Sequence, residues 1–402
     1  MIPELDDRRS ALRVAAALAL GAAVSLGLAR FSYALLLAPM RADLGWSYLT
    51  AGAMNTVNAG GYLVGALLAP RWLARFDARA ALLAGSAAAA LLLAAHGAAS
   101  DDAALYLLRL ATGVASAAAF VSGGLLAARL AATHPRSSGL TLGIYYGGTG
   151  LGIVASALLA PPLIAMPAAQ GWRWAWVALG VAAAVSTAFI AANTRALAAP
   201  PARAADRVPF DWRPFAPGLA GYFMFGLGYI GYMTFVITLL REQQLGTTQI
   251  VAFFVLLGAG VVASSWLWAG LLQRCRGGEA LALLNGLLAL ATVLPVLGAH
   301  PLLVYASGLL FGSVFLSVVA STTSLVRHNL PAALWPGGIS AFTIVFAAGQ
   351  IIGPSAVGWI ADGSGGLQRG LASSALALAL GAVLAWRQKP LHAAALAGSG
   401  RP

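Results

Sequence analysis

Two arginines stand inside long apolar runs, where a positive charge is costly. Arg30 lies in the run 12–40 and Arg109 in the run 103–131. A charged side chain in the middle of a membrane-spanning helix costs about 2.5–3.5 kcal/mol on insertion scales, so it normally faces a wet cavity or a partner. A guanidinium carries a planar fork of N–H donors that matches a carboxylate. The two arginines therefore favour a site for an anion.

The acidic residues cannot neutralise these charges. By position along the chain, all twelve fall in loops, in tails or at the ends of apolar runs: Glu4, Asp6, Asp7, Asp43, Asp77, Asp101, Asp102, Asp206, Asp211, Glu242, Glu279 and Asp362. An unneutralised arginine pair attracts an anion and repels a cation. A central carboxylate that could relay protons is also missing. If an anion crosses a membrane at this site, its movement is expected to be coupled to a proton carried with it, to an exchanged anion, or to no ion.

The elements that must position these residues are apolar runs. The chain of 402 residues is 60% hydrophobic and only 9% charged, whereas soluble domains carry about 25% charged residues. The runs are long enough to cross a bilayer as helices, which satisfy their own backbone hydrogen bonds. We expect twelve, near 12–40, 48–70, 79–98, 103–131, 138–165, 172–193, 214–240, 247–273, 280–299, 302–326, 338–361 and 369–387. The fold class predicted is an all-α membrane protein.

The arginines and the one lysine in the gaps predict the topology. Eighteen fall on the side of the two termini and four on the other side, while Arg30 and Arg109 lie within helices. By the positive-inside rule both termini are expected in the cytoplasm. The high alanine and arginine content, with one lysine, fits a GC-rich bacterial genome, so the multi-pass protein is expected in a bacterial inner membrane, with 12–40 as a retained first helix. The charge pattern orients helices and predicts no nucleic-acid partner. The single cysteine, Cys275, predicts no metal site and no cofactor.

One polar stretch divides six helices from six. We expect an N-terminal half 1–193, a cytoplasmic linker 194–213, a C-terminal half 214–390 and a cytoplasmic tail 391–402. The halves repeat at an offset of 199: Gly27 corresponds to Gly226, Gly113 to Gly312 and Gly150 to Gly349. Because six helices separate the equivalents, the halves share one orientation, which predicts two parallel six-helix pseudo-repeats with a solute site between them.

The chain resembles the major facilitator superfamily, and in detail its bacterial YbfB/YjiJ-type family. The resemblance lies in the segments 29–40 and 58–66, in Arg109 with Gly113, and in a glycine-rich fifth helix. It implies the major facilitator fold, secondary transport, and a cavity lined by the first, fourth, seventh and tenth helices. The superfamily's motif in the loop after the second helix survives only as Gly65 with a basic loop. In the superfamily, the fourth-helix arginine often bonds neighbouring backbone instead of a ligand.

The predicted substrate site is electropositive on one wall and aromatic on the other. At the offset of 199, Arg30 becomes Tyr229 and Arg109 becomes Gly308, so positive charge is confined to the first half. The residues predicted to bind substrate are Arg30, Tyr33, Asn58, Arg109, Tyr145, Tyr229, Tyr232 and Gln350. Each has a competing structural interpretation, because polar groups in apolar runs also hydrogen-bond between helices.

Small residues are expected to serve packing and gating. Gly113, Gly147, Gly148 and Gly152 allow close helix contact, and Gly353 with Pro354 marks an expected kink. The run 147–150 has no downstream lysine and lies in a predicted membrane span, so it does not indicate a nucleotide site. No combination of residues predicts an enzyme.

The functional hypothesis is a monomeric secondary transporter for a small organic anion of the carboxylate type, working by alternating access in the lipid bilayer. Its partners would be this small-molecule solute and a coupling proton or counter-anion. One alternative is an exporter of neutral or amphipathic compounds. A second alternative, from a different class, is a membrane sensor on a transporter fold that moves no solute.

Overall fold

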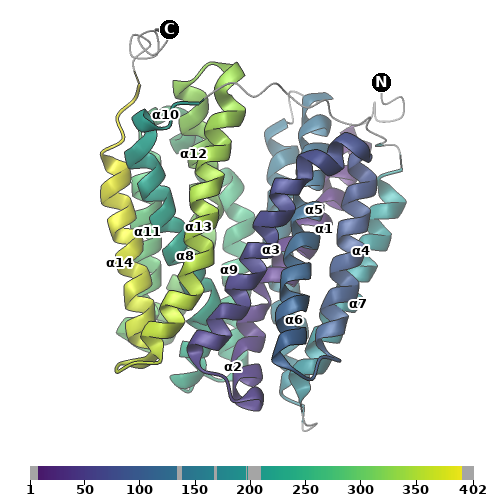
Figure 1. The fold of residues 1–402 in the computed structure, drawn as a ribbon, viewed down its shortest axis with the longest axis vertical. Helices are drawn as coiled ribbons and strands as arrows, with labels where there is room; N and C mark the ends of the chain where they lie inside the picture. The colour runs from purple at the N-terminus through teal and green to yellow at the C-terminus, as the bar shows by residue number, and fades with distance from the viewer. Residues whose placement is uncertain (1–7, 134–137, 167–169, 196, 198–209, 392–402) are drawn as a thin grey trace.

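A computed structural model describes residues 8–133, 138–166, 170–195, 197 and 210–391. Every regular element in this part of the chain is helical (Figure 1). Most of the expected linker 194–213 and of the expected tail 391–402 lies outside the described residues.

The first half begins with one long, subdivided span. It consists of α1 (Arg8–Ala22), the π-helical segment η1 (Ala23–Phe31) and α2 (Tyr33–Leu44). The following helices are α3 (Tyr48–Arg75), α4 (Ala78–His96), α5 (Asp102–Thr133), α6 (Ser138–Ile164) and α7 (Gly171–Asn193).

The second half starts with a short 3-10 turn, η3 (Arg213–Phe215). The helices that follow are α8 (Ala216–Glu242), α9 (Thr247–Leu267), α10 (Ala269–Arg274), α11 (Glu279–Leu297), α12 (Pro301–Asn329), α13 (Trp335–Ala361) and α14 (Gly366–Trp386), with a 3-10 turn η4 (Ala332–Leu334) before α13.

The expected membrane spans are present. Among the described residues, eleven helical stretches are long and apolar enough to cross a bilayer, and α9 continues into α10 within one of them. The remaining span, α3, falls outside that set and carries Asn55, Thr56 and Asn58. It nevertheless packs inside the bundle between α5 and α13. The prediction of twelve spanning helices is therefore confirmed, and its most polar member lies between the halves.

The two halves repeat each other in structure. The contact of α3 with α5 corresponds to that of α9 with α12, and α4 packs on α7 as α11 packs on α14. The residues that precede α3 and α9, Ser47 and Gly246, are 199 positions apart, as are the left-handed turn residues Gly45 and Gln244. The halves meet along three pairs, α3 with α13, α6 with α9 and α2 with α8. The parallel pseudo-repeat is thus visible in both turns and packing.

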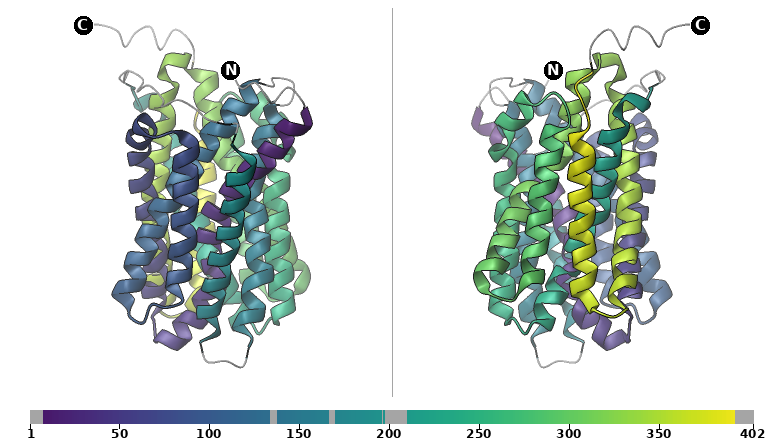
Figure 2. Two further views of the ribbon diagram at one scale, coloured as in Figure 1. Left: turned by 90° about the vertical axis from the view of Figure 1, so that its right-hand side faces the viewer. Right: turned by 90° about the vertical axis from the view of Figure 1, so that its left-hand side faces the viewer.

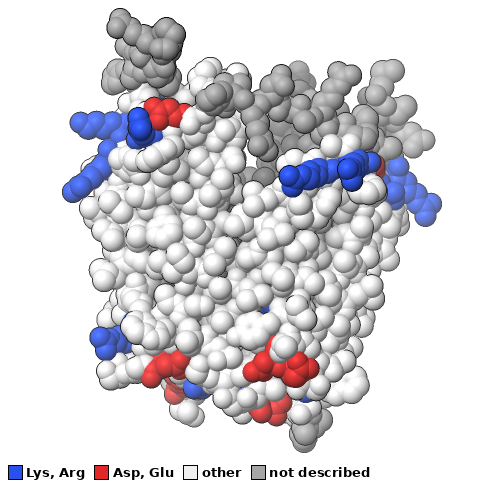
Figure 3. Space-filling view, viewed as in Figure 1, with Lys and Arg blue, Asp and Glu red and all other residues white. Residues whose placement is uncertain are grey.

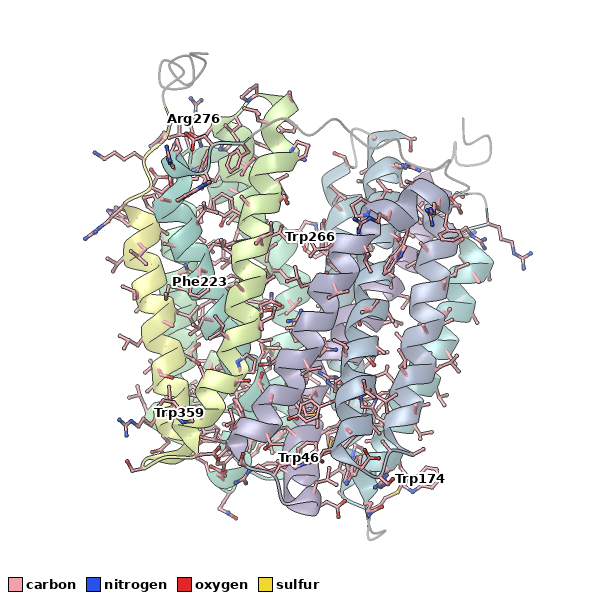
Figure 4. The ribbon with its side chains drawn as sticks, viewed as in Figure 1. Trp46, Trp174, Phe223, Trp266, Arg276 and Trp359 are labelled. Carbon is pink, nitrogen blue, oxygen red and sulfur yellow. The ribbon has the colours of Figure 1, made fainter. Side chains whose placement is uncertain are left out.

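The two ends of the bundle differ in charge. We call the end where α1 begins and α14 ends the terminal end, and the end where α2 joins α3 the distal end (Figures 1 and 2). On the face drawn in Figure 3, most Lys and Arg atoms lie at the terminal end, Asp and Glu lie mainly at the distal end together with a few Lys or Arg atoms, and the belt between is almost free of charged atoms. Trp46, Trp174 and Trp359 lie toward the distal end (Figure 4). Trp174 and Trp359 are exposed, as expected for an interfacial aromatic belt, whereas Trp46 is buried.

Candidate functional site

The first arginine is presented by the π-helical segment of the first span. In η1 the hydrogen bonds reach five residues back, as in Ser32 N to Gly27 O at 3.1 Å, and every residue of η1 is buried. A side chain on Gly27 would collide with the backbone of Gly152 in α6, so glycine allows this wider helix to pack closely. Single π-helical turns occur often at functional sites. Arg30 stands near the end of the segment.

Arg30 is buried and only partly satisfied. Its side chain is 3% exposed, and Nη2 donates a hydrogen bond to Oε1 of Gln350 in α13 of the other half. The guanidinium carbon lies 5.5 Å from the centre of the Tyr62 ring in α3. Nε is buried and has no hydrogen-bond partner among the described residues. A buried charged donor without a partner is costly, so this guanidinium retains binding capacity.

Arg109 is buried and bonded on every side by its own half. Nη1 donates to Ala29 O at 3.1 Å, Nη2 to Asn55 Oδ1 at 3.2 Å and Nε to Met54 O at 3.5 Å. The guanidinium lies 4.7 Å from the centre of the Tyr33 ring. These contacts tie α5 to η1 and α3. They match the bonding that the superfamily resemblance implies for an arginine of this kind.

Arg109 Nη1 donates to the carbonyl of Ala29, the residue directly before Arg30, so both buried guanidinium groups belong to one region. Among the described residues, neither guanidinium donates a hydrogen bond to a carboxylate. The carboxylates of Asp43 and Asp102 are instead bonded by the indole N–H groups of Trp172 and Trp46. The region between Arg30 and Arg109 is therefore net positive.

An aromatic stack of the second half lies beside Arg30. The ring of Tyr229 stacks on Phe225, Phe346 and Phe315 with centroid separations of 4.7, 5.6 and 5.9 Å. Phe31, the residue after Arg30, meets the ring of Phe315 edge-on at 5.7 Å, and Phe346 lies one helical turn before Gln350 in α13. The structure thus brings Arg30, Gln350 and Tyr229, three of the residues predicted to bind substrate, to one place.

Two predicted residues support Arg109 instead. The hydroxyl of Tyr33 donates to Ala51 O at 2.8 Å while its ring covers Arg109. Asn58 Nδ2 donates to the backbone carbonyl of Arg109 at 3.0 Å. Both side chains are buried. Their hydrogen bonds stay inside the first half, between its first two spans and α5.

Two further predicted tyrosines are bonded inside single halves. The Tyr145 hydroxyl donates to Phe120 O at 2.6 Å and joins α6 to α5. The Tyr232 hydroxyl shares a hydrogen bond of 2.6 Å with Ser307 Oγ, and its ring stacks on Phe311 at 4.0 Å. In the described part of the chain, neither tyrosine forms a hydrogen bond or a ring contact with Arg30.

The glycines of α6 face two different neighbours. Side chains on Gly148 and Gly152 would collide with backbone of α1 and η1, within the same half. Gly147 instead packs near Val262 of α9, and Gly150 approaches the backbone of Gly258 in the same helix. The helix is therefore packed tightly to its own half on one side and to the opposite half on the other.

The remaining small residues bring other helix pairs together. Gly113 of α5 lies against the backbone of α3 near Asn58, and Gly353 of α13 lies against the backbone of α8 near Leu227. The carbonyl of Pro354 is close to Gly52 of α3 in the opposite half. The helix continues through Pro354.

Hydrogen bonds between the halves occupy only part of the interface. Among the described residues they join Arg30 to Gln350, Asn55 to Thr234, Thr56 to Ile351 and Ser355, Tyr48 to Glu242 and Asp362, and Leu49 to Asp362. Measured along each helix, these residues lie at the depth of Arg30 or closer to the distal end. The described halves are therefore bonded together from Arg30 to the distal end.

Tyr62 is the contact that sequence reasoning missed. It follows Asn58 by four residues, so both lie on one face of α3. The signal was present in the segment 58–66, which was used only for the family resemblance. A tyrosine ring over a guanidinium attracts the cation through its π-face, and Tyr62 therefore belongs to the Arg30 site.

The arrangement suits one kind of ligand chemistry. Among the described residues, no cluster of His, Cys, Asp and Glu could hold a metal ion. The groups that converge are a guanidinium with a spare donor, an amide from the other half and an aromatic surface. Together they can hold an anionic group and an apolar body, with no covalent step.

Comparisons with known proteins identify the architecture. The family model described as "Uncharacterised MFS-type transporter YbfB" matches residues 22–386. A search of curated proteins gives no match.

Several solved structures have a similar fold. A bacterial homolog of the human lysosomal transporter Spinster, in an inward-facing and unoccupied conformation, superposes with a TM-score of 0.71 at 13% identity, covering 94% of this chain and 97% of that chain. The nucleoside transporter NupG gives 0.70 at 13% identity, with coverages of 94% and 97%. The human organic anion transporter MFSD10 gives 0.64 at 15% identity, with coverages of 93% and 99%. At these identities the similarity concerns the fold alone.

Proposed function

We propose that this chain, which belongs to the YbfB family of MFS-type transporters, moves a small organic anion of the carboxylate type. The similar folds include one transporter described for organic anions and one for nucleosides. The fold is thus compatible with charged and uncharged solutes, and the substrate class has to be argued from the site residues.

The observation that carries the proposal is the incomplete bonding of Arg30. Its Nε has no partner among the described residues, and its Nη2 reaches an uncharged amide, Gln350. A carboxylate would accept from both nitrogens in a bidentate, charge-assisted pair, each such bond contributing about 1.5–3 kcal/mol. The ligand's negative charge would also offset the buried positive charges of Arg30 and Arg109. A neutral or cationic head group offers neither gain.

Gln350 links binding to movement of the halves. In this structure its amide oxygen accepts the Arg30 bond across the interface. A carboxylate that takes over Nη2 would displace the amide, and the halves would lose one hydrogen bond at the depth of the site. Binding of the anion and loosening of the interface would then be coupled, as alternating access requires.

The aromatic stack supports a second candidate, export of neutral or amphipathic compounds. Tyr222, Phe225, Tyr229 and Phe346 form stacked pairs at 4.7–5.6 Å. Such a surface can pack on the apolar part of a charged or of an uncharged molecule. We place this body next to the anionic head in the main proposal, and the screen below separates the two candidates.

The terminal end is proposed to face the cytoplasm of a bacterial cell. The Lys and Arg residues that gather there (Figure 3) support this orientation through the positive-inside rule. The distal end would then face outward. Monomeric transport, with a proton carried by the substrate or with an exchanged anion, is the simplest scheme for a site without a carboxylate of its own.

The test is a ligand screen on purified protein in detergent. Monocarboxylates are compared with their methyl esters and with amines of the same carbon skeleton, by thermal shift, for the wild type, Arg30→Gln and Arg387→Gln. The last variant removes the same charge at an exposed position after α14. We expect carboxylates alone to stabilise the wild type and Arg387→Gln, and to lose their effect on Arg30→Gln. Stabilisation by esters that survives Arg30→Gln would favour the neutral exporter.

A further inference from the structure

The distal end of α3 is capped by a carboxylate from the opposite half. Tyr48 N donates to Asp362 Oδ1 at 2.7 Å and Leu49 N donates to Asp362 Oδ2 at 2.9 Å. The next backbone donor, Thr50 N, is satisfied locally by Ser47 Oγ at 3.0 Å. The first backbone N–H groups of a helix have no partner within the helix, and a negative charge beside them is stabilising. Asp362 thus completes the N-terminus of a helix to which it does not belong.

The side chain of Tyr48 forms a second connection at the same place. Its hydroxyl donates to the carboxylate of Glu242, at the end of α8 in the other half. Its ring is covered by the guanidinium of Arg41 at 3.7 Å and meets the edge of Phe235 at 6.3 Å. One residue of α3 therefore contacts two helices of the second half.

Close backbone packing seals the same region. A side chain on Gly358 of α13 would collide with the Tyr48 carbonyl, and one on Gly52 of α3 would collide with the Pro354 carbonyl. Glycines on both helices bring the backbones of α3 and α13 together beside the Asp362 cap. Separation of the halves at this end must break the cap and these contacts at once.

Among the described residues, the cap has no equivalent at the matching position of the repeat. The helix that corresponds to α3 at the offset of 199 is α9, which begins after Gly246. There the N-terminal donor Gly246 N is bonded by Gln249 Oε1 of the same helix at 2.9 Å. At the terminal end of α3, hydrogen bonds from Arg71 or Arg75 to the second half are not found among the described residues. The connection is thus specific to one end of one helix.

We propose that Asp362, Tyr48 and Glu242 form a latch that holds the distal side of the transporter shut. The latch closes when the Asp362 carboxylate docks on the N-terminus of α3, and opening exposes the Tyr48 and Leu49 N–H groups to water. This inference concerns the conformational equilibrium and does not depend on the substrate class. Weakening the latch must therefore raise the population with a separated distal end even without ligand.

The experiment measures a distance across the distal end. In a Cys275→Ser background, spin labels are placed at Trp174→Cys on α7 and Leu302→Cys on α12, two exposed helical positions, one in each half. Double electron–electron resonance then reports the closed and open populations in detergent and in nanodiscs. Asp362→Asn keeps an acceptor oxygen but removes the charge. We expect it to raise the ratio of open to closed molecules about tenfold, the factor that corresponds to about 1.4 kcal/mol.

A matched control is available within one half. Asp101 also accepts from a helix N-terminus, Ala104 N at 2.8 Å, but both groups belong to the first half. Asp101→Asn should leave the distance distribution unchanged. Glu242→Gln, which weakens the latch through the Tyr48 hydroxyl, should shift it in the same direction as Asp362→Asn and serves if that variant folds poorly. Distributions for Asp362→Asn and Glu242→Gln that superpose on the parent would overturn the latch.

Discussion

Arg30 and Arg109 are both buried arginines of the first half, yet they are bonded in opposite ways. All three guanidinium nitrogens of Arg109 donate hydrogen bonds to acceptors of its own half. Arg30 donates one hydrogen bond to the opposite half, and its Nε has no partner among the described residues. The difference teaches that a charge inside an apolar run does not reveal its role by type and depth alone. The acceptors that reach it decide whether it stabilises a half or holds a ligand.

The largest expected effect is a loss of stability when Arg109 is replaced, which tests its difference from Arg30. Arg109→Gln removes three hydrogen bonds, including the one that Asn55 Oδ1 accepts, and the cation–π contact with Tyr33, so we expect a loss of about 3 kcal/mol or more of stability. Arg30→Gln removes one bond and also a buried, incompletely satisfied charge, so its net effect should stay within about 1 kcal/mol. Thermal unfolding and the monodisperse fraction after solubilisation check both variants. Equal losses would remove the distinction between the two arginines.

A smaller effect is expected when the amide opposite Arg30 becomes a carboxylate. Gln350→Glu supplies a permanent acceptor that competes with the ligand for the guanidinium, so carboxylate affinity should fall at least about tenfold. Gln350→Met has a similar length but offers no comparable acceptor, and it should still bind. Isothermal titration with the best carboxylate of the screen measures both. Undiminished affinity of Gln350→Glu would show that the anion does not use Arg30.

The smallest effect concerns the ring over Arg30. Tyr62→Leu removes a cation–π contact of about 0.5–2 kcal/mol, which corresponds to an affinity loss of about two- to thirtyfold. Tyr62→Phe keeps the ring and should bind nearly as well as the wild type. If Tyr62→Phe and Tyr62→Leu lose carboxylate affinity equally in the same titration, then the hydroxyl, and not the aromatic face, is what Tyr62 contributes.

The fold was predictable from the sequence to an unusual depth because the bilayer restricts the choice of structure. Apolar runs of spanning length have to be helices. The offset of 199, which paired Gly27 with Gly226 in the sequence, also relates the left-handed turn residues Gly45 and Gln244 of the structure. The π-helical form of η1 was not predictable. A shift from four- to five-residue hydrogen bonding leaves no mark in a run rich in small apolar residues, and it depends on the close approach of Gly27 to Gly152.

The site was predictable only where a single residue carried the signal. Arg30 could be identified because a charge in an apolar run is costly, and Gln350 because it is polar in another run. Their pairing joins residues 320 positions apart, and the Asp362 cap joins residues 314 and 313 apart. Such pairs arise from the packing of the halves and have no local sequence pattern. For the same reason Tyr33 and Tyr229, which look alike in the sequence, have different neighbours: Tyr33 covers Arg109, and Tyr229 belongs to the aromatic stack of the second half.

The central claim is that Arg30 anchors a carboxylate during transport. It is tested most directly by uptake of the radiolabelled carboxylate selected by the screen, into proteoliposomes containing the wild type, Arg30→Lys, Arg30→Gln or Arg387→Gln. The proposal predicts that both Arg30 variants lose at least about 90% of the initial rate, as the loss of about 1.4 kcal/mol requires, because a lysine cannot reproduce the bidentate fork. Arg387→Gln should transport like the wild type. Carboxylate uptake by Arg30→Gln at the wild-type rate would contradict the account.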